Sequence, residues 1–126
     1  MRHLKWVSLA VKEAEKSLHI QRVGAVVFNK KQFISSGHNY PNRSIARSHN
    51  PRFRRWPTSI HAEIDAITKA RCDLKGSSII IIRINKKGQL RLAKPCRHCM
   101  SYLNHIGIKN VYYSISKYPY VEKLKR

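Results

Sequence analysis

The sequence predicts an α/β domain in which helices cover both faces of a mixed β-sheet. Three features carry this prediction: an amphipathic helical pattern near the N-terminus, a β-branched run at residues 78–84, and a strand–helix–strand order over residues 79–114. The two strands of such a unit should be parallel, with a right-handed crossover between them. The chain has 126 residues, of which 42% are apolar, enough for a single domain, residues 1–126, with a hydrophobic core.

The N-terminal part is expected to form a helix followed by a β-hairpin. Over residues 2–17, apolar residues recur every three or four positions, which is typical of a helix with one apolar face. That face holds Leu4, Val7, Val11, Ala14 and Leu18, and the side chains expected to point to solvent are Lys5, Lys12, Glu13 and Lys16. The run 23–28 predicts a buried strand, and residues 32–38 predict a second strand antiparallel to it.

The rest of the chain alternates helices and strands after a long loop. Residues 41–58 contain three prolines and five arginines with little periodicity, so we expect a loop there. The spacing of apolar residues then predicts a helix over 61–71, a strand over 78–84, a helix over 97–106 and a strand over 109–114. Residues 89–92 are compatible with an extension of the strand that precedes them.

The charge balance of the chain is far from that of an ordinary domain. There are 26 Lys and Arg residues against 6 Asp and Glu residues, a net charge of +20. Such an excess favours a polyanionic partner, above all nucleic acid, although a solvated basic surface without a specific partner is the plain alternative. No apolar run is long enough to span a membrane, and three cysteines form a poor disulfide framework. We therefore expect an intracellular, cytoplasmic protein without a membrane partner.

Two short motifs stand at the starts of two predicted helices: His-Ala-Glu at residues 61–63 and Pro-Cys-Arg-His-Cys at residues 95–99. Thiolates and neutral imidazole are ligands that zinc prefers. Cys96 and Cys99 lie three residues apart at a helix N-terminus, where the helix dipole favours thiolate over thiol, and His61 would supply the imidazole. Three protein ligands leave one position open, which is typical of catalytic zinc. The motifs therefore predict one catalytic Zn²⁺ per chain.

Glu63 is the candidate acid–base residue of this site. A zinc ion lowers the pKa of its bound water toward ~7. Because Glu63 follows His61 by two residues, its carboxylate can reach that water without binding the metal. We expect it to take the proton of the water and to deliver it to a ring nitrogen and then to a departing amine.

With these residues in place, the sequence resembles the cytidine deaminase superfamily, whose signature is H-x-E followed by P-C-x-x-C. The resemblance covers roughly residues 1–115. It implies a three-layer α/β/α sandwich, cytidine deaminase-like, with a mixed sheet of four to five strands. It places His61, Cys96 and Cys99 on the zinc ligands of the superfamily and Glu63 on its proton carrier.

The resemblance also implies residues that bind the substrate. Asn39 matches an asparagine that contacts the substrate sugar, although such a residue can equally stabilise a turn. Ala62, Val23 and Ala25 match positions that shape the base pocket. Lys94 departs from the family, in which serine, threonine or glutamate often precedes the Pro-Cys pair. Members often assemble through their helices, which leaves a homo-oligomer open. The tail, residues 115–126, is too short for a further helix and strand, so it either stays outside the sheet or pairs at its edge.

Other interpretations of the cysteines remain open from the sequence. A Cys-x-x-Cys pair between a strand and a helix is also typical of a thioredoxin-type redox motif, and His98 or Cys72 would complete a structural zinc site. We expect His98 to point away from the focus of the two thiolates and Cys72 to be a packed thiol. The preceding His-Ala-Glu motif favours catalytic zinc over both alternatives.

The long loop combines cations with aromatic rings. The residues concerned are Arg43, Arg47, Arg52, Phe53, Arg54, Arg55 and Trp56. Arginines bind phosphates and aromatic rings stack on bases, so we expect a nucleic-acid-binding or phosphate-binding loop beside His61. The alternatives are a solvated loop with its two aromatic rings packed underneath, and a loop in which one or two arginines bind the phosphate of a free nucleotide.

The sequence therefore predicts hydrolytic deamination of a cytosine-type base to uracil, with single-stranded DNA or RNA as the favoured substrate. A deaminase of free dCMP or cytidine is the first alternative, because the stretch at residues 61–67 is similar to that of deoxycytidylate deaminases. An adenosine deaminase acting on transfer RNA is the second. A non-enzymatic, zinc-stabilised RNA-binding module is the third.

Overall fold

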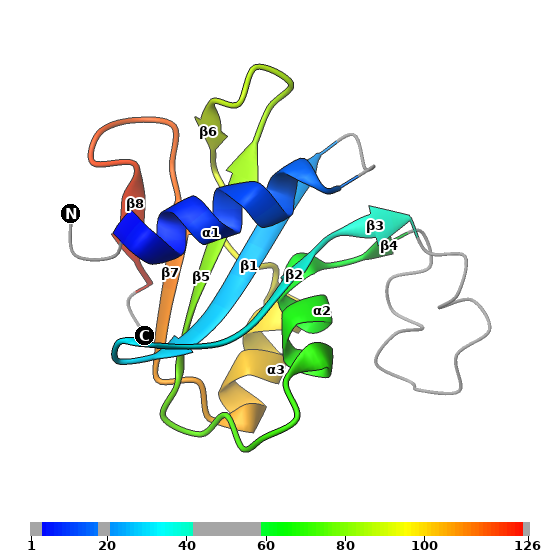
Figure 1. Cartoon of the computed structure of the whole chain (residues 1–126), viewed down its shortest axis with the longest axis vertical. Helices are drawn as coiled ribbons and strands as arrows, with labels where there is room; N and C mark the ends of the chain where they lie inside the picture. Colours follow the sequence, from blue (N-terminus) through cyan, green and yellow to red (C-terminus); the bar gives the residue numbers. More distant parts are fainter. Residues whose placement is uncertain (1–3, 18–20, 42–58, 125–126) are drawn as a thin grey trace.

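A mixed β-sheet forms the centre of the computed structural model, which describes residues 4–17, 21–41 and 59–124. Within these residues the main sheet has six strands, in the order β2-β1-β5-β7-β8 with β6 paired to the end of β5 (Figure 1). The strands are β1 (Arg22–Asn29), β2 (Gln32–His38), β5 (Ser78–Ile84), β6 (Leu90–Arg91), β7 (Asn110–Ser114) and β8 (Val121–Lys123). β5 and β7 are parallel, as predicted, and the other described pairs are antiparallel.

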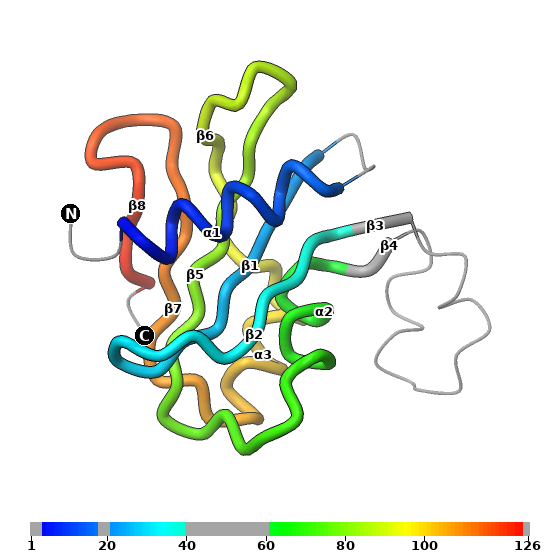
Figure 2. The backbone as a smooth tube through the Cα atoms, in the orientation of Figure 1, coloured from blue at the N-terminus to red at the C-terminus, as the bar shows by residue number. Residues whose placement is uncertain are grey.

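Helices cover both faces of this sheet, which confirms the predicted three-layer architecture (Figures 1 and 2). α1 (Leu4–Glu15) packs on the face that carries Ile80 and Ile82 of β5. α2 (Ala62–Lys69) and α3 (Arg97–Ile106) pack on the face that carries Ile79 and Ile81. Successive residues of a strand point to opposite faces, so the unbroken apolar run of β5 serves both cores.

Two glycines let helices approach the sheet at backbone distance. A Cβ atom on Gly24 of β1 would overlap the carbonyl oxygen of Ala10 in α1. A Cβ atom on Gly37 of β2 would overlap the backbone nitrogen of Ala66 in α2. The side chain of Ser35 adds a hydrogen bond to the Ala66 carbonyl (2.8 Å), and Asp65 accepts one from the backbone N–H of His38 (3.1 Å). These contacts fix the position of α2, whose first turn carries the His-Ala-Glu motif.

The predicted faces of α1 are wrong at two residues, one on each face, and Leu18 lies outside the described residues. Leu4, assigned to the apolar face, is 63% exposed, because it begins the helix beyond the edge of the core. Glu13, assigned to solvent, is buried. Its carboxylate accepts hydrogen bonds from Lys16 (3.0 Å) and Ser36 (2.9 Å) and lies 3.1 Å from Nδ1 of His38. An acid can occupy the buried side of a helix when such donors replace its water.

The edges of the sheet also differ from the sequence prediction. The tail does pair at an edge, because β8 runs antiparallel to β7 and Glu122 accepts a hydrogen bond from the Tyr113 hydroxyl (2.9 Å). Residues 90–91 do not extend β5; they fold back on it as β6 after a turn held by the side chain of Asn85. The sheet is therefore larger than the four to five strands predicted. No helix among the described residues is long and apolar enough to cross a membrane.

A second, two-stranded ladder closes the base of the predicted long loop. β3 (Tyr40–Pro41) pairs with β4 (Ser59–Ile60), so Pro41, predicted as the first residue of the loop, belongs to a strand (Figure 1). Residues 42–58, with the arginines and aromatic rings predicted to bind nucleic acid, lie outside the described part of the chain.

Candidate metal centre and active site

The start of α2 and the start of α3 supply the metal-binding side chains. His61 is the N-cap of α2 and Cys96 is the N-cap of α3, and both have extended backbone angles. Neither side chain caps its own helix by a hydrogen bond. Cys99 lies on the first turn of α3 and is fully buried. The N-cap positions turn His61 and Cys96 away from their helices and toward the same point as Cys99.

The distances between these three residues fit a zinc ion. Nδ1 of His61 lies 3.2 Å from Sγ of Cys99 and 3.7 Å from Sγ of Cys96. All three ligand atoms lie within 4.8 Å of one another. Tetrahedral zinc with ordinary Zn–N and Zn–S bond lengths places nitrogen and sulfur about 3.6 Å apart. The donor set and its spacing therefore match three of the four positions of a zinc site.

The alternative ligands do not join this group. His98 and Cys72 are absent from the potential metal cluster found among the described residues. His98 is exposed. The prediction that Cys72 is a packed thiol is wrong: the residue lies beyond the end of α2, in the connection to β5, and its thiol is exposed. The described part of the chain therefore offers three ligands at this site, the number typical of catalytic zinc.

Protonation of the metal-free cluster is shared among its members. The hydrogen bond with Cys99 and contact with His61 together outweigh the opposing effect of burial and lower the pKa of Cys96 to about 3. The same contact with Cys96 raises the pKa of the Cys99 thiol. The hydrogen bond to Cys96 raises the pKa of His61, against the opposing effect of burial. A divalent cation would replace the shared protons and hold both sulfurs as thiolates.

Glu63 lies in the first turn of α2, and its carboxyl group is buried beside the cluster. Burial raises the pKa of Glu63 above the ordinary value of a carboxyl group. Glu63 lines the same pocket as His61 and Cys96 without belonging to the metal-binding group. A buried acid beside the metal-binding group, outside the set of ligands, has the position required of a proton carrier.

The pocket beside the cluster has a volume of about 210 Å³. This lies below the ~300–1,000 Å³ typical of sites for drug-sized ligands, so it suits a single base better than a large ligand. Of the residues predicted from the sequence, the pocket is lined by His61, Cys96, Glu63, Ala62, Val23 and Asn39. Ala25 does not line the pocket: it lies two residues beyond Val23 along β1 and is fully buried in the core.

Asn39 holds the floor of this pocket together. Its side-chain oxygen accepts hydrogen bonds from the backbone N–H of Val23 (2.9 Å) and from the hydroxyl of Ser17 (2.7 Å), and its amide nitrogen donates to the Gln21 carbonyl. These contacts join the end of α1 to β1 and β2. Asn39 therefore combines a place in the pocket wall with a structural role like the turn-stabilising one weighed from the sequence.

Six pocket residues were not predicted as site residues: Gln21, Ile81, Arg83, Leu92, Ala93 and Lys94. Arg83 had a signal in the sequence, because it is the one charged residue in the run Ser78–Ile84. Lys94 had a weaker one, its departure from the family pattern before Pro95. Gln21 and Leu92 carry no distinctive pattern, and only the folded chain brings them to the pocket.

Comparisons with known proteins agree with this geometry. A family model for the cytidine and deoxycytidylate deaminase zinc-binding region matches residues 1–115. A dCMP deaminase from the cyanophage S-TIM5 is similar in structure, with a TM-score of 0.62 and 20% identity over 88% of this chain and 80% of that one. A cytidine deaminase from Burkholderia pseudomallei has a TM-score of 0.65 and 16% identity over 99% and 93% of the two chains. No curated protein sequence matches the chain.

The two structures share the fold at low identity, and the family match spans most of the chain. The His61, Cys96 and Cys99 group is positioned for the zinc that the family binds. A redox pair and a non-enzymatic RNA-binding module are thereby excluded. The chain belongs to the cytidine and deoxycytidylate deaminase family, and it is a zinc-dependent hydrolase that deaminates a cytosine-type base.

Proposed function

We propose that the enzyme converts cytosine to uracil within single-stranded nucleic acid, with Glu63 as its proton carrier. The observation that carries the chemistry is the meeting of the zinc-binding group and the buried Glu63 in one pocket. The overall reaction forms a C–O bond from water, breaks the C–N bond of the exocyclic amine, and releases ammonia.

The protein groups divide the work of this reaction. Bound by His61, Cys96 and Cys99, zinc supplies the Lewis acidity that makes hydroxide available at neutral pH. Glu63 accepts the proton of the attacking water, delivers it to the ring nitrogen, and then protonates the departing amine. Ala62, which is small and buried, leaves room for the ring beside Glu63. Asn39 and its hydrogen-bond partners hold their part of the pocket wall in place.

The preference for a polynucleotide rests on the charge of the whole chain. A net charge of +20 attracts a polyanion along much of its length. Arg43, Arg47, Arg52, Arg54 and Arg55 precede the site in sequence and would hold the backbone, with Phe53 and Trp56 stacking on neighbouring bases. The target base would enter the pocket singly, unstacked from its neighbours.

A free nucleotide is the second candidate substrate. The S-TIM5 enzyme, which is 21% identical over 90% of this chain with a TM-score of 0.56, has been solved in complex with dCMP and dUMP. The small volume of the pocket suits this alternative as well as it suits a flipped base.

Parallel assays of the zinc-loaded enzyme on dCMP, cytidine, single-stranded DNA and single-stranded RNA test the proposal. We expect uracil to form on one of the single-stranded polynucleotides with the highest kcat/KM of the four. Conversion of dCMP alone would contradict the polynucleotide proposal and favour the second candidate. Transfer RNA with an accessible adenosine is a fifth substrate, and inosine formation there without uracil formation elsewhere would contradict both.

A further inference from the structure

Arg83 is a cation on the active-site face of an otherwise apolar strand. Along β5, Ile79 and Ile81 point to the face covered by α2 and α3, whereas Ile80, Ile82 and Ile84 point to the face covered by α1. Since side chains alternate between the two faces, Arg83 continues the row of Ile79 and Ile81. Both Arg83 and Ile81 line the pocket.

No acid in the described part of the chain neutralises Arg83. The ion pairs found there join Glu13 to Lys16 and His38, and Asp65 to Lys69. Glu63 lines the same pocket but forms no ion pair with Arg83. Arg83 is half-buried, so part of its hydration is lost without a charged group of the protein in exchange. Such an arrangement costs free energy in the free enzyme and leaves the guanidinium available to an anion.

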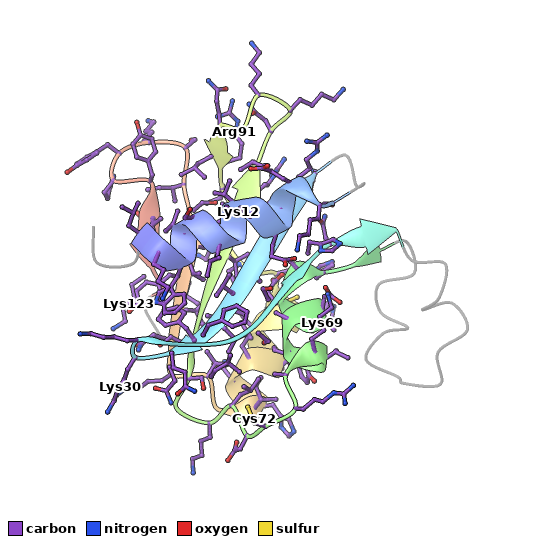
Figure 3. All side chains as sticks on the ribbon, in the orientation of Figure 1. Lys12, Lys30, Lys69, Cys72, Arg91 and Lys123 are labelled. Atoms are coloured by element: carbon purple, nitrogen blue, oxygen red, sulfur yellow. The ribbon has the colours of Figure 1, made fainter. Side chains whose placement is uncertain are left out.

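The strand pairing adds a second cation beside Arg83. Arg83 of β5 is directly opposite Arg91 of β6, and like charges in this position destabilise a sheet. The buried hydroxyl of Ser114 holds the pair in register, because it accepts a hydrogen bond from the Arg83 N–H (3.0 Å) and donates one to the Arg91 carbonyl (2.6 Å). The guanidinium of Arg91 donates to the Leu90 carbonyl and to the Gln89 side chain. Figure 3 shows Arg91 at β6, close to the end of β5.

Lys94 brings a third cation to the same place from another segment. It is exposed, lines the pocket, and lies two residues before the zinc ligand Cys96. The lining of the pocket therefore combines the zinc ligands His61 and Cys96 and the acid Glu63 with two cations, Arg83 and Lys94. Arg91 lies opposite Arg83 in the strand pairing.

We propose that Arg83 and Lys94 bind a phosphate group of the substrate, so that the pocket selects a cytosine-type base carried by a nucleotide over one carried by a nucleoside. The inference deepens the proposed function and rests on it, because it assigns the phosphate to the pocket in which the base reacts. A guanidinium binds phosphate through two parallel hydrogen bonds, and the nearby ammonium adds charge. The phosphate is either the terminal monoester of a free nucleotide or an internal diester of a strand.

The test measures binding of reaction products, which are not turned over. Calorimetric titration of the zinc-loaded enzyme with dUMP and with deoxyuridine gives the phosphate preference as the ratio of the two affinities. We expect Arg83→Gln to weaken dUMP binding about 10- to 100-fold, the range for a lost hydrogen bond to a charged group, and to leave deoxyuridine binding unchanged. Lys94→Gln should act in the same direction with a smaller effect.

Arg22→Gln is the matched control. Arg22 is also half-buried at the same end of the sheet, but it pairs with Ile84 and alternates with Val23, so its side chain belongs to the opposite face. The same change of net charge there should leave the phosphate preference intact. Arg83→Gln also removes one member of a like-charge pair, so its unfolding temperature should hold or rise, whereas loss of a purely structural arginine would lower it. Arg83→Lys should restore part of the preference.

A trinucleotide with a central deoxyuridine and no terminal phosphate distinguishes the two phosphate sources. Weaker binding of the trinucleotide by Arg83→Gln assigns an internal diester, and weaker binding of dUMP alone assigns a monoester. Unchanged affinities of both ligands in Arg83→Gln and Lys94→Gln would overturn the inference while leaving deamination intact. Failure of the proposed function gives a different result, because the phosphate preference would then persist in an enzyme that forms no uracil.

Discussion

The three zinc ligands differ in their surroundings. Cys99 is fully buried, His61 is half-buried and Cys96 is exposed. A polar or charged group that loses its partner inside a protein costs more free energy than one at the surface. Loss of the metal should therefore cost more free energy at the buried Cys99 than at the exposed Cys96.

Substitutions of the two cysteines should separate metal binding from stability. We expect Cys96→Ser and Cys99→Ser each to weaken zinc binding by more than ~100-fold, because each removes a direct ligand. The free energy of unfolding should fall further in Cys99→Ser, where a hydroxyl replaces a thiol inside the core. Metal analysis and urea denaturation check both points, with Cys72→Ser, an exposed thiol outside the cluster, as the control. A wild-type chain without about one zinc per molecule would contradict the assignment.

Glu63→Gln should remove catalysis and keep the metal. Glutamine fills the same buried space but cannot carry the proton, so we expect kcat to fall by ~10²–10⁴-fold. Zinc content and the unfolding temperature should stay near those of the wild type, since Glu63 is not a ligand. Glu15→Gln changes the same charge at an exposed position of α1 and should leave kcat unchanged. Full activity in Glu63→Gln would refute the role of proton carrier.

Glu13 should make the fold sensitive to acid. Burial raises its pKa, but the hydrogen bonds from Lys16, His38 and Ser36 outweigh burial and hold the pKa below the ordinary value of 4.5. A carboxyl group whose pKa is lower in the folded chain stabilises the fold above its unfolded pKa, and this contribution is lost as the pH falls through the folded pKa.

Glu13→Gln should therefore be less stable than the wild type at neutral pH, and the difference should shrink as the pH falls below about 4.5. Both proteins lose zinc in acid, because the thiolates become protonated, so the difference between them isolates Glu13. Urea denaturation at several pH values gives the measurement. A difference independent of pH between 3 and 7 would contradict the assignment.

Short motifs made the zinc ligands and Glu63 predictable from the sequence. The surroundings of Glu13 and Arg83 depend on strand pairing and packing between distant segments, which the sequence alone does not show. His61, Glu63, Cys96 and Cys99 lie within two segments of three to five residues, so their spacing alone indicates a common focus. The burial of Glu13 depends on donors from β2, more than twenty residues away. The place of Arg83 in the pocket depends on which face of β5 it occupies, and that follows from the pairing of β5 with its neighbours.

The two faces of the sheet are packed by different helices, and only the helices on one face carry zinc ligands at their starts. α1 touches the sheet at Gly24, on the face away from the zinc ligands, and α2 touches it at Gly37, on the face that carries them. The long elements were predictable because each contains several apolar residues with one period. β6 and β8 contain two and three residues, too few to show a period, so the size of the sheet was underestimated.

Substitution of alanine for Gly24 or Gly37 should show which helix–sheet contact positions the zinc site. We expect Gly24→Ala and Gly37→Ala each to lower the free energy of unfolding by about 1–3 kcal/mol, because the added methyl group meets backbone atoms that must move. Displacement of α2 also displaces His61, so Gly37→Ala should weaken zinc binding, whereas Gly24→Ala should not. Denaturation and zinc titration of the two variants provide the comparison. Equal zinc affinities in both variants would show that the packing of α2 does not position the ligand.

The charge of the whole molecule should appear as a salt dependence of binding. For single-stranded nucleic acid, the logarithm of the binding constant falls with the logarithm of the salt concentration, with a slope of about −0.7 per neutralised phosphate. Replacing Arg52, Arg54 and Arg55 by glutamine should therefore reduce the slope by about 2. Fluorescence anisotropy with a labelled oligonucleotide measures this slope.

A triple replacement of Lys30, Lys31 and Lys75 removes the same charge from exposed positions. Figure 3 shows Lys30 at the turn between β1 and β2. This control should leave most of the slope intact. If both triple variants change the slope equally, binding depends on net charge alone and the loop has no special part in it.

The small ladder of β3 and β4 lets the segment between the two strands change without moving the zinc ligands. Tyr40 pairs with Ile60 and Pro41 with Ser59, so the chain returns to a fixed place directly before His61. Each doubling of the length of a closed loop costs only ~0.6 kcal/mol. We therefore expect insertions, deletions or substitutions among residues 42–58 to leave the zinc ligands in their places. Substitutions concentrated in this segment would change the substrate preference of related enzymes and leave the residues that catalyse C–N bond cleavage unchanged.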